Sequence, residues 1–401
     1  MRVRVCDDDE AMADGWVADI KKVTDGYDVE RMASAKEEIS KLLLRKIAAE
    51  KEQDLTEVAC GFDDIDILVV DYDLLHLDDD GSRTTGEGVA RLARTFSSCG
   101  VIVVMNQFKG PQFDLGMRGH LDSHADLNVD ANLIGRRALW HALEPAAGQF
   151  NPTTWTPLPI LLSAVHSLAA DLENAGLDAT IMDLLGLPEE ALSELSDTAF
   201  GFVDSEAETT DQLATVTVRG FLSQALRDEA LVKAFEAHSP KTLFSFAAFR
   251  IAKWLERAVL RPMDVIVDGL HLVDRLPFMI DPEKIDVTDP ANWHKAALNP
   301  AEFLRWEVLG KYRNEKASAY VGRTVFDWYR LAGDEQIDQL QDAYITKDEV
   351  RFFLAEDTSR FVVREAVTRF RADFHNFGDR RAVEQLRGDI TYGPMRRVTF
   401  G

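Results

Sequence analysis

Apolar and polar positions divide the chain into two parts with different patterns. Over residues 1–145, short apolar runs alternate with longer segments in which apolar residues recur every three or four positions. Short apolar runs are typical of buried strands, and the longer period is typical of amphipathic helices. Regular alternation of the two predicts an α/β domain, in which a parallel sheet is covered by helices on both faces.

The elements of this first part follow from the same pattern. Strands are predicted at residues 3–6, 27–32, 65–70, 101–105 and 127–129, and helices at 11–22, 33–51, 88–96 and 134–143. The run at 65–70 is apolar almost throughout, as expected for a strand covered on both faces. Residues 76–86 are polar and rich in Asp, which predicts a loop with a solvated turn at Asp78, Asp79 and Asp80.

A proline-rich break ends this alternation. Pro and Gly cluster over residues 145–159, which predicts a linker at 146–160 between a domain at 1–145 and a second domain at 161–401. Beyond the break, helices are predicted at 160–174, 188–195, 218–237, 243–260, 300–312, 319–332, 335–344, 347–355 and 359–374. Strands are expected only at 264–267 and 397–400. The second domain is therefore predicted to be mostly α-helical, and no motif in it identifies its output activity.

Carboxylates follow two of the predicted strands. Asp7 and Asp8 come directly after the strand at 3–6, and Asp71 comes directly after the strand at 65–70. Because ligands in open α/β sheets bind beyond the carboxyl ends of the strands, we expect these side chains to meet. Clustered carboxylates repel one another, and Mg²⁺ is a hard cation that prefers such oxygen ligands. The sequence therefore predicts an acidic Mg²⁺ pocket.

Composition narrows the choice of partners. The formal net charge of -24 argues against DNA or RNA, because proteins that bind nucleic acids usually carry a basic patch. No apolar run approaches the roughly 18 to 20 residues that cross a bilayer, and the first residues do not look like a secretory signal. Cys6, Cys60 and Cys99 lack metal-ligand spacing and indicate reduced, buried thiols. We expect a cytoplasmic protein that binds neither DNA nor membranes.

The first part of the chain resembles the receiver domain of two-component response regulators. Residues 3–12 (Val-Arg-Val-Cys-Asp-Asp-Asp-Glu-Ala-Met) are similar to the first strand and acidic pair of that family. Residues 66–71 (Asp-Ile-Leu-Val-Val-Asp) are similar to its third strand and phosphoacceptor, residues 88–94 to its third helix, and residues 100–105 to its fourth strand. The resemblance ends at the proline-rich break, and it implies a flavodoxin-like, doubly wound sheet of five parallel strands.

The resemblance also implies roles for individual residues. Asp71 would be the phosphoacceptor, Asp7 and Asp8 would hold Mg²⁺, and Asp73 would offer its backbone carbonyl to the metal. A histidine kinase or a phosphotransfer protein would donate the phosphoryl group. A carboxylate becomes a competent nucleophile there because the cation neutralises the incoming oxygens. The phosphorylated domain would then act on an output protein partner or on a second copy of the chain, as a homodimer.

Two positions depart from the family. Met105 stands where receivers carry Thr or Ser at the end of the fourth strand, and residues 127–131 contain no Lys after the fifth. Asn106 is the candidate replacement for the hydroxyl donor, and Lys109 is the candidate replacement for the phosphate-binding cation. The departures leave a second hypothesis open, in which the domain is a pseudo-receiver that only docks other proteins.

A third hypothesis places an effector enzyme in the second domain. Arg369 and His375 have the spacing found in HEPN ribonucleases, but Arg136 and His141 have it too, so the pattern is weakly specific. Asp264, Asp268, His271 and Asp274 form an acid-plus-His group that is the other basis of this hypothesis, but their spacing matches no metal motif and predicts surface loop residues. His166 is predicted to be a core histidine in an apolar helix. The leading hypothesis expects no enzymatic activity beyond Mg²⁺-dependent self-phosphorylation at Asp71.

Overall fold

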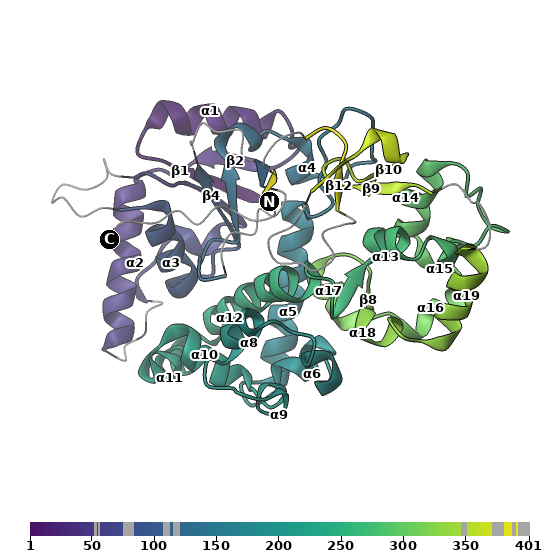
Figure 1. Cartoon of the computed structure of the whole chain (residues 1–401). Helices are drawn as coiled ribbons and strands as arrows, with labels where there is room; N and C mark the ends of the chain where they lie inside the picture. Colours follow the sequence, from purple (N-terminus) through teal and green to yellow (C-terminus); the bar gives the residue numbers. More distant parts are fainter. Residues whose placement is uncertain are drawn as a thin grey trace.

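The structure, a computed structural model, describes residues 1–51, 54, 57–74, 84–106, 113–114, 121–345, 351–370, 381–386 and 390–391. A five-stranded sheet occupies the first part of the chain (Figure 1). Its strands are β1 (Arg2–Cys6), β2 (Asp28–Arg31), β3 (Ile67–Asp71), β4 (Val101–Asn106) and β6 (Leu127–Asp130), in the order β2-β1-β3-β4-β6. Every neighbouring pair is parallel, which confirms the predicted α/β class and parallel sheet.

Helices cover this sheet as its apolar strands require. Helices α1 (Glu10–Lys21), α2 (Ala35–Glu50) and α3 (Gly86–Phe96) follow β1, β2 and β3 in turn. Every residue of β3 is buried, because the strand has neighbours on both sides and cover on both faces. The helix predicted at 134–143 is reduced to the single turn α4 (Arg137–Trp140), which follows the 3₁₀ turn η4 (Ala131–Leu133).

Two long helices join the sheet to the rest of the molecule. Helix α5 (Leu158–Ala175) contacts β4, and α12 (Pro240–Trp254) lies against both α5 and α3 (Figure 1). One hydrophobic core runs from the sheet into these helices, and the buried residues Trp155 and Leu158 continue it across the predicted linker. The division of the chain into domains at 1–145 and 161–401 stays a prediction.

The remaining helices are mostly short. They are α6 (Ile181–Leu185), α7 (Glu189–Leu192), α8 (Asp197–Val203), α9 (Thr210–Ala214), α10 (Val218–Leu226), α11 (Glu229–His238), α13 (Gly269–Arg275), α14 (Pro290–Leu298), α15 (Pro300–Phe303), α16 (Trp306–Leu309), α17 (Glu315–Val321), α18 (Trp328–Leu331) and α19 (Glu335–Ile345). A π-helical turn, η5 (Leu255–Leu260), extends α12. No helix among the described residues has both the length and the apolar character to cross a membrane.

The second part of the chain contains more strands than predicted. A ribbon pairs β7 (Ile266–Asp268) with β8 (Val325–Asp327). A four-stranded sheet, named here the C-terminal sheet, has the order β10-β9-β12-β11 and consists of β9 (Phe353–Ala355), β10 (Arg360–Val362), β11 (Thr368–Arg369) and β12 (Ala382–Val383). The helices predicted at 347–355 and 359–374 are therefore wrong over their described residues. Short apolar segments fit both periods, and pairing between distant strands decides between them.

Local breaks explain two further differences. The helix predicted at 319–332 is split into α17, β8 and α18, because Gly322 takes a left-handed conformation with φ of 71°. The helix predicted at 218–237 is split into α10 and α11 at Arg227, whose φ is 55°. The strand predicted at 397–400 lies outside the described residues.

Candidate functional site

The register of the sheet places two acidic side chains next to each other. Cys6 of β1 pairs with Val70 of β3, so the residues that follow them, Asp7 and Asp71, stand at neighbouring positions. Adjacent strands are about 4.8 Å apart. Both residues lie at the carboxyl edge of the sheet, where open α/β folds bind ligands. Asp8 follows directly and is half-buried.

Both carboxylates are buried. Asp7 is 9% exposed and Asp71 is 3% exposed. Each accepts a hydrogen bond from the backbone two residues on: Asp9 N donates to Asp7 Oδ1 at 3.0 Å, and Asp73 N donates to Asp71 Oδ2 at 3.1 Å. The second oxygen of Asp7, Oδ2, is buried and accepts no hydrogen bond. A buried carboxylate oxygen without a donor is unfavourable unless a cation or a proton reaches it.

The electrostatics of the pocket show the same excess of negative charge. Burial, together with the nearby Asp71, raises the pKa of Asp7 to about 7. Burial, followed by the charges of Asp7, Asp8 and Asp71, raises the pKa of the Cys6 thiol to about 12. Because the pKa of Asp7 is higher in the folded state, its contribution to stability is present below the unfolded pKa near 3.8 and is lost as pH rises through about 7. A bound cation would reverse that loss.

The residues present fit a magnesium ion of the partly hydrated kind. Mg²⁺ commonly takes one or two protein carboxylates and keeps several waters. Asp7 and Asp71 supply such a pair, and the partnerless Asp7 Oδ2 is the oxygen that most needs a cation. Across the described part of the chain, no three His, Cys, Asp or Glu side chains are arranged as a ready metal cage. Asp9 has a different task, because its carboxylate caps α1 by accepting from Ala11 N and Met12 N.

The other predicted residues lie around this edge. Met105 pairs in register with Asp71 and is fully buried, whereas Asn106, which ends β4, is half-buried. The backbone of Asp73 bridges to Thr85. Lys109 lies outside the described residues. After β6, Asp130 caps the turn η4.

The start of α3 lies directly against the acidic edge. Gly86 N donates to Tyr72 O at 2.8 Å, and a Cβ atom at Gly86 would lie only 2.2 Å from Asp71 O. No side chain fits in that gap. The next residue, Glu87, accepts from Ser123 Oγ at 2.8 and 2.9 Å. The position of Asp71 is therefore tied to the first turn of α3.

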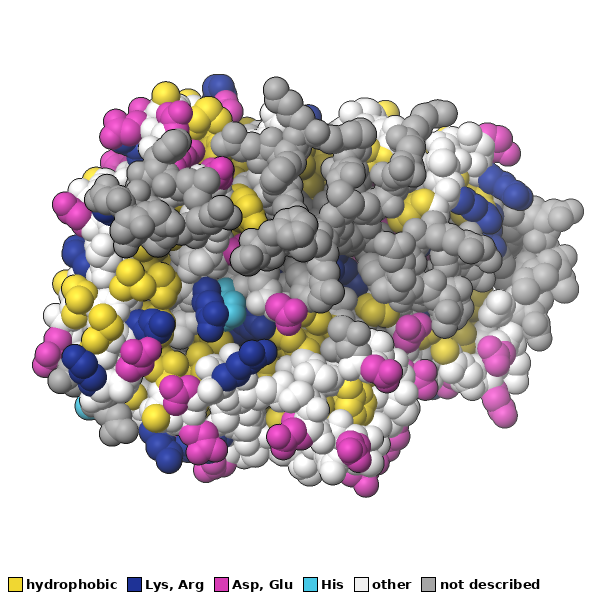
Figure 2. All heavy atoms as spheres, turned by 60° about the vertical axis from the view of Figure 1, so that its left-hand side comes forward, with side chains coloured by type: hydrophobic (Ala, Val, Ile, Leu, Met, Phe, Trp, Pro, Cys, Tyr) yellow, Lys and Arg dark blue, Asp and Glu magenta, His cyan; other side chains and the backbone are white. Residues whose placement is uncertain are grey.

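Buried Lys and Arg side chains of α12 contact the segment around Ser123, which is hydrogen-bonded to the start of α3. Lys253 of α12 is 1% exposed and donates to the carbonyls of Ser123 at 2.9 Å and Ala125 at 2.7 Å. Arg250 donates to the same Ser123 carbonyl at 2.8 Å. Burial, followed by the charge of Arg250, lowers the pKa of His124 to about 2. Figure 2 shows Lys and Arg side chains gathered around a histidine on one face, in a chain that is acidic overall.

A second polar cluster, in the last third of the chain, is buried. Asp268, His271 and Asp274 are buried, so their prediction as surface loop residues is wrong; only Asp264 is half-buried. Asp268 ends β7 and caps α13 by accepting from His271 N at 3.0 Å. An Asp three residues before a His at a helix start was the available sequence signal. The partners at residues 356 and 381 were not predicted, because both residues lie outside the predicted helices and strands.

The remaining histidine and arginine candidates lie apart. His166 is exposed on α5 rather than in the core, and it lines a cleft of about 770 Å³ at the amino edge of the sheet. Arg369 ends β11, not a helix, and His375 lies outside the described residues. Arg136 and His141 flank α4, and His141 Nε2 is 2.6 Å from Val23 O. The three cysteines are free and buried.

Comparison with known proteins yields no match: no family model, no curated protein and no solved structure is similar to this chain.

Proposed function

We propose that this chain is a cytoplasmic phosphorelay protein, an atypical response regulator whose receiver-like sheet accepts a phosphoryl group on Asp71. The observation that carries the proposal is the buried Asp7–Asp71 pair at the carboxyl edge, with one Asp7 oxygen lacking a hydrogen-bond donor. The strand order β2-β1-β3-β4-β6 supports it, because this is the flavodoxin-like order that receivers share. A histidine kinase or phosphotransfer protein is the proposed donor.

The proposed reaction uses the side chains at the carboxyl edge. A carboxylate oxygen of Asp71 attacks the phosphorus of a phosphohistidine, the P–N bond breaks, and the departing imidazole keeps the electron pair and takes a proton from solvent. Mg²⁺ would neutralise the oxygens of the transferred group. Asp7 and Asp8 would hold the ion with the backbone carbonyl of Asp73. The Asn106 amide and, outside the described residues, Lys109 are the proposed contacts to the bound phosphoryl group.

The contacts around Asp71 also suggest how the helical part would sense the change. New charge on Asp71 lies against the first turn of α3, whose Glu87 is hydrogen-bonded to Ser123. Ser123 in turn is held by Arg250 and Lys253 of α12. A shift of α3 would therefore pull on α12, which belongs to the proposed output part. The output partner of that part is a protein of unknown type.

Phosphorylation in vitro tests the proposal. Incubation with acetyl phosphate and Mg²⁺, followed by intact-mass spectrometry, is expected to give one phosphoryl adduct on the wild-type protein. The Asp71→Asn variant is expected to give none, because an amide is not a nucleophile toward phosphorus. Asp64→Asn, which changes an exposed acid at the opposite edge of the sheet, serves as the control and should match wild type.

The same experiment separates the pseudo-receiver hypothesis. Full burial of apolar Met105 beside Asp71 favours that hypothesis, because a hydroxyl donor normally stands there in receivers. No adduct on wild type, or equal adducts on wild type and Asp71→Asn, would overturn Asp71 as the phosphoacceptor and favour the docking module.

A further inference from the structure

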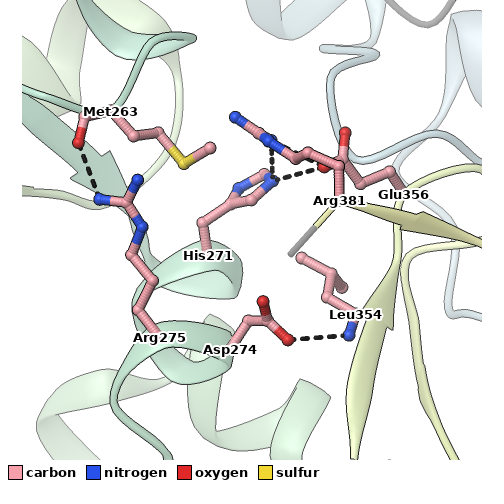
Figure 3. Close-up of a pocket in the computed structure, with 7 residues that line it drawn as sticks. All are labelled: Met263, His271, Asp274, Arg275, Leu354, Glu356 and Arg381. Atoms are coloured by element: carbon pink, nitrogen blue, oxygen red, sulfur yellow. Dashed lines mark hydrogen bonds and ion pairs between the residues drawn. The ribbon is translucent and has the colours of Figure 1, made fainter. Parts of the chain in front are cut away.

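Three distant segments meet at His271. The imidazole Nδ1 lies 2.8 Å from Asp268 Oδ1 at the end of β7, and Nε2 lies 3.1 Å from an Arg381 guanidinium nitrogen beside β12 (Figure 3). Glu356, which follows β9, has Oε1 3.6 Å from His271 Nε2 and 2.7 Å from Arg381. All four side chains are at least nine-tenths buried. We name these four residues the His271 clasp.

In the His271 clasp, Nε2 of the imidazole can bond to Arg381 or to Glu356, depending on whether it carries a proton. A neutral imidazole that donates from Nδ1 to Asp268 has a lone pair on Nε2, which accepts from Arg381. A protonated imidazole has a proton on Nε2, which must find an acceptor and repels the guanidinium. Glu356 can supply that acceptor, because its Oε2 is buried and has no hydrogen-bond donor. Arg381 keeps Glu356 and the Arg261 carbonyl as partners when it leaves His271.

The cavity beside the clasp limits what it can do. His271, Asp274, Glu356 and Arg381 line a space of about 20 Å³, together with Met263, Arg275 and Leu354 (Figure 3). A space of that size admits about one water molecule. A substrate of ordinary size does not reach the imidazole, but a proton does.

We propose that His271 is a proton-operated switch, which binds the C-terminal sheet to α13 tightly when protonated and loosely when neutral. Apart from the clasp, α13 holds this sheet by the hydrogen bond from Leu354 N to Asp274 Oδ1, at 3.0 Å. Protonated His271 adds a charged contact to Glu356, and deprotonation removes it.

The charges around His271 give the direction of the switch. Two carboxylates and one guanidinium contact the imidazole, and the net effect of Asp268 and Glu356 over burial is a raised pKa for His271. Folding therefore favours the protonated form, and its contribution to stability is lost as pH rises through the folded pKa. The charged groups that face His271 or its partners are Asp268 from β7, Asp274 and Arg275 from α13, Glu256 and Arg261 from η5, Arg323 before β8, Glu356 after β9 and Arg381 before β12.

The clasp acts on the linker as well. Thr153 N donates to Glu356 O at 2.8 Å, Asn151 N donates to Asp357 O at 2.9 Å, and Ser359 Oγ donates to Asn151 O at 2.6 Å. The C-terminal sheet therefore holds the segment that joins the five-stranded sheet to α5. A change at His271 reaches the connection between the two parts of the chain.

Hydrogen exchange measured by mass spectrometry on the full chain tests the switch. After correction for intrinsic exchange, protection of peptides covering residues 353–362 and 381–386 is expected to fall about tenfold between pH 5.5 and 8.5, the loss expected when one hydrogen bond between charged groups is removed. In His271→Gln this pH dependence should vanish. Glu356→Gln, which removes one carboxylate, should move the midpoint to lower pH.

His294→Gln is the matched control. His294 is also buried, and its Nδ1 lies 2.9 Å from Ser359 O, directly before β10, but burial lowers its pKa, the opposite direction to that of His271. This variant should keep the pH dependence of wild type. Equal pH dependence in wild type and His271→Gln, a flat wild-type profile, or an unmoved midpoint in Glu356→Gln would overturn the switch. The last two readouts apply even if His271→Gln does not fold.

Discussion

Replacement of Arg94 by Met is expected to lower the free energy of unfolding by about 3–5 kcal/mol, the usual effect of removing one partner of a buried ion pair. Arg94 and Asp126 are each 2% exposed and are paired. The guanidinium also donates to Cys99 O at 2.9 Å and Gly100 O at 2.8 Å, and it stacks over Phe249 of α12. Met fills most of the volume but leaves the Asp126 carboxylate buried without its ion-pair partner.

Urea unfolding, followed by tryptophan fluorescence, measures this effect. Arg91→Met is the matched control, because Arg91 lies one turn earlier on α3 and is exposed. It should change the free energy of unfolding by no more than about 0.5 kcal/mol. Adding Asp126→Asn to Arg94→Met should recover part of the loss, since the unpaired charge is then gone. Similar losses of free energy in Arg94→Met and Arg91→Met would show that the ion pair does not stabilise the junction between α3 and α12.

Replacement of Gly86 by Ala is expected to disrupt the acidic edge. The added Cβ would lie 2.2 Å from Asp71 O, so either α3 or the end of β3 must move. Overpacking of this kind costs about 1–3 kcal/mol. A displacement of about 1 Å at a reacting group can slow its reaction about a hundredfold, and we expect a fall of that order in phosphoryl transfer to Asp71.

Gly88→Ala tests whether the effect comes from position rather than from glycine itself. Gly88 lies on the same helix, and a Cβ there meets only Thr85 Oγ1 at an ordinary 3.4 Å. It should leave the transfer rate unchanged and stabilise α3 by about 0.5–1 kcal/mol. Rates of adduct formation with acetyl phosphate and melting curves give both quantities. An unchanged rate in Gly86→Ala would mean that α3 does not position Asp71.

Much of the five-stranded sheet could be predicted because its signals are local. The apolar run that becomes β3 is buried throughout, and α2 buries Ile39 and Leu42, although Leu43 and Ile47 of the same helix are exposed. The placing of Asp7 beside Asp71 follows from two such strands ending at one edge. The residues of each strand are enough to predict that strand, and the helices that connect the strands then favour a parallel arrangement.

The C-terminal sheet could not be predicted in the same way. Its strands have two or three residues each, too few for a period of 2 to be distinguished from one of 3.6. Their pairing joins Ala355 to Ala382, and a helical spacing of aromatics around Phe352 was equally consistent with the sequence. The His271 clasp depends on that pairing, so it could not be predicted from the sequence either.

Contacts between layers were also beyond prediction. Lys253 and Arg250 lie on a predicted helix, but they donate to carbonyls more than a hundred residues away, which the local pattern does not indicate. His166 shows the converse, because an apolar helix placed it at the rim of a cleft and not in the core. The rotation of a helix about its own axis depends on its neighbours, which the local period does not specify.

Titration of Mg²⁺ by calorimetry tests most directly whether Asp7, which follows β1, and Asp71, which ends β3, bind the same cation. Wild type, Asp7→Asn, Asp71→Asn and the double variant should be compared near pH 8, with Asp64→Asn as control. Each single variant is expected to lose at least about tenfold in affinity, and the double variant little more, because both carboxylates serve one ion. Wild-type affinity should also fall below about pH 7, as Asp7 takes up a proton. Unchanged Mg²⁺ affinity in Asp71→Asn, or losses that simply add in the double variant, would contradict a shared site.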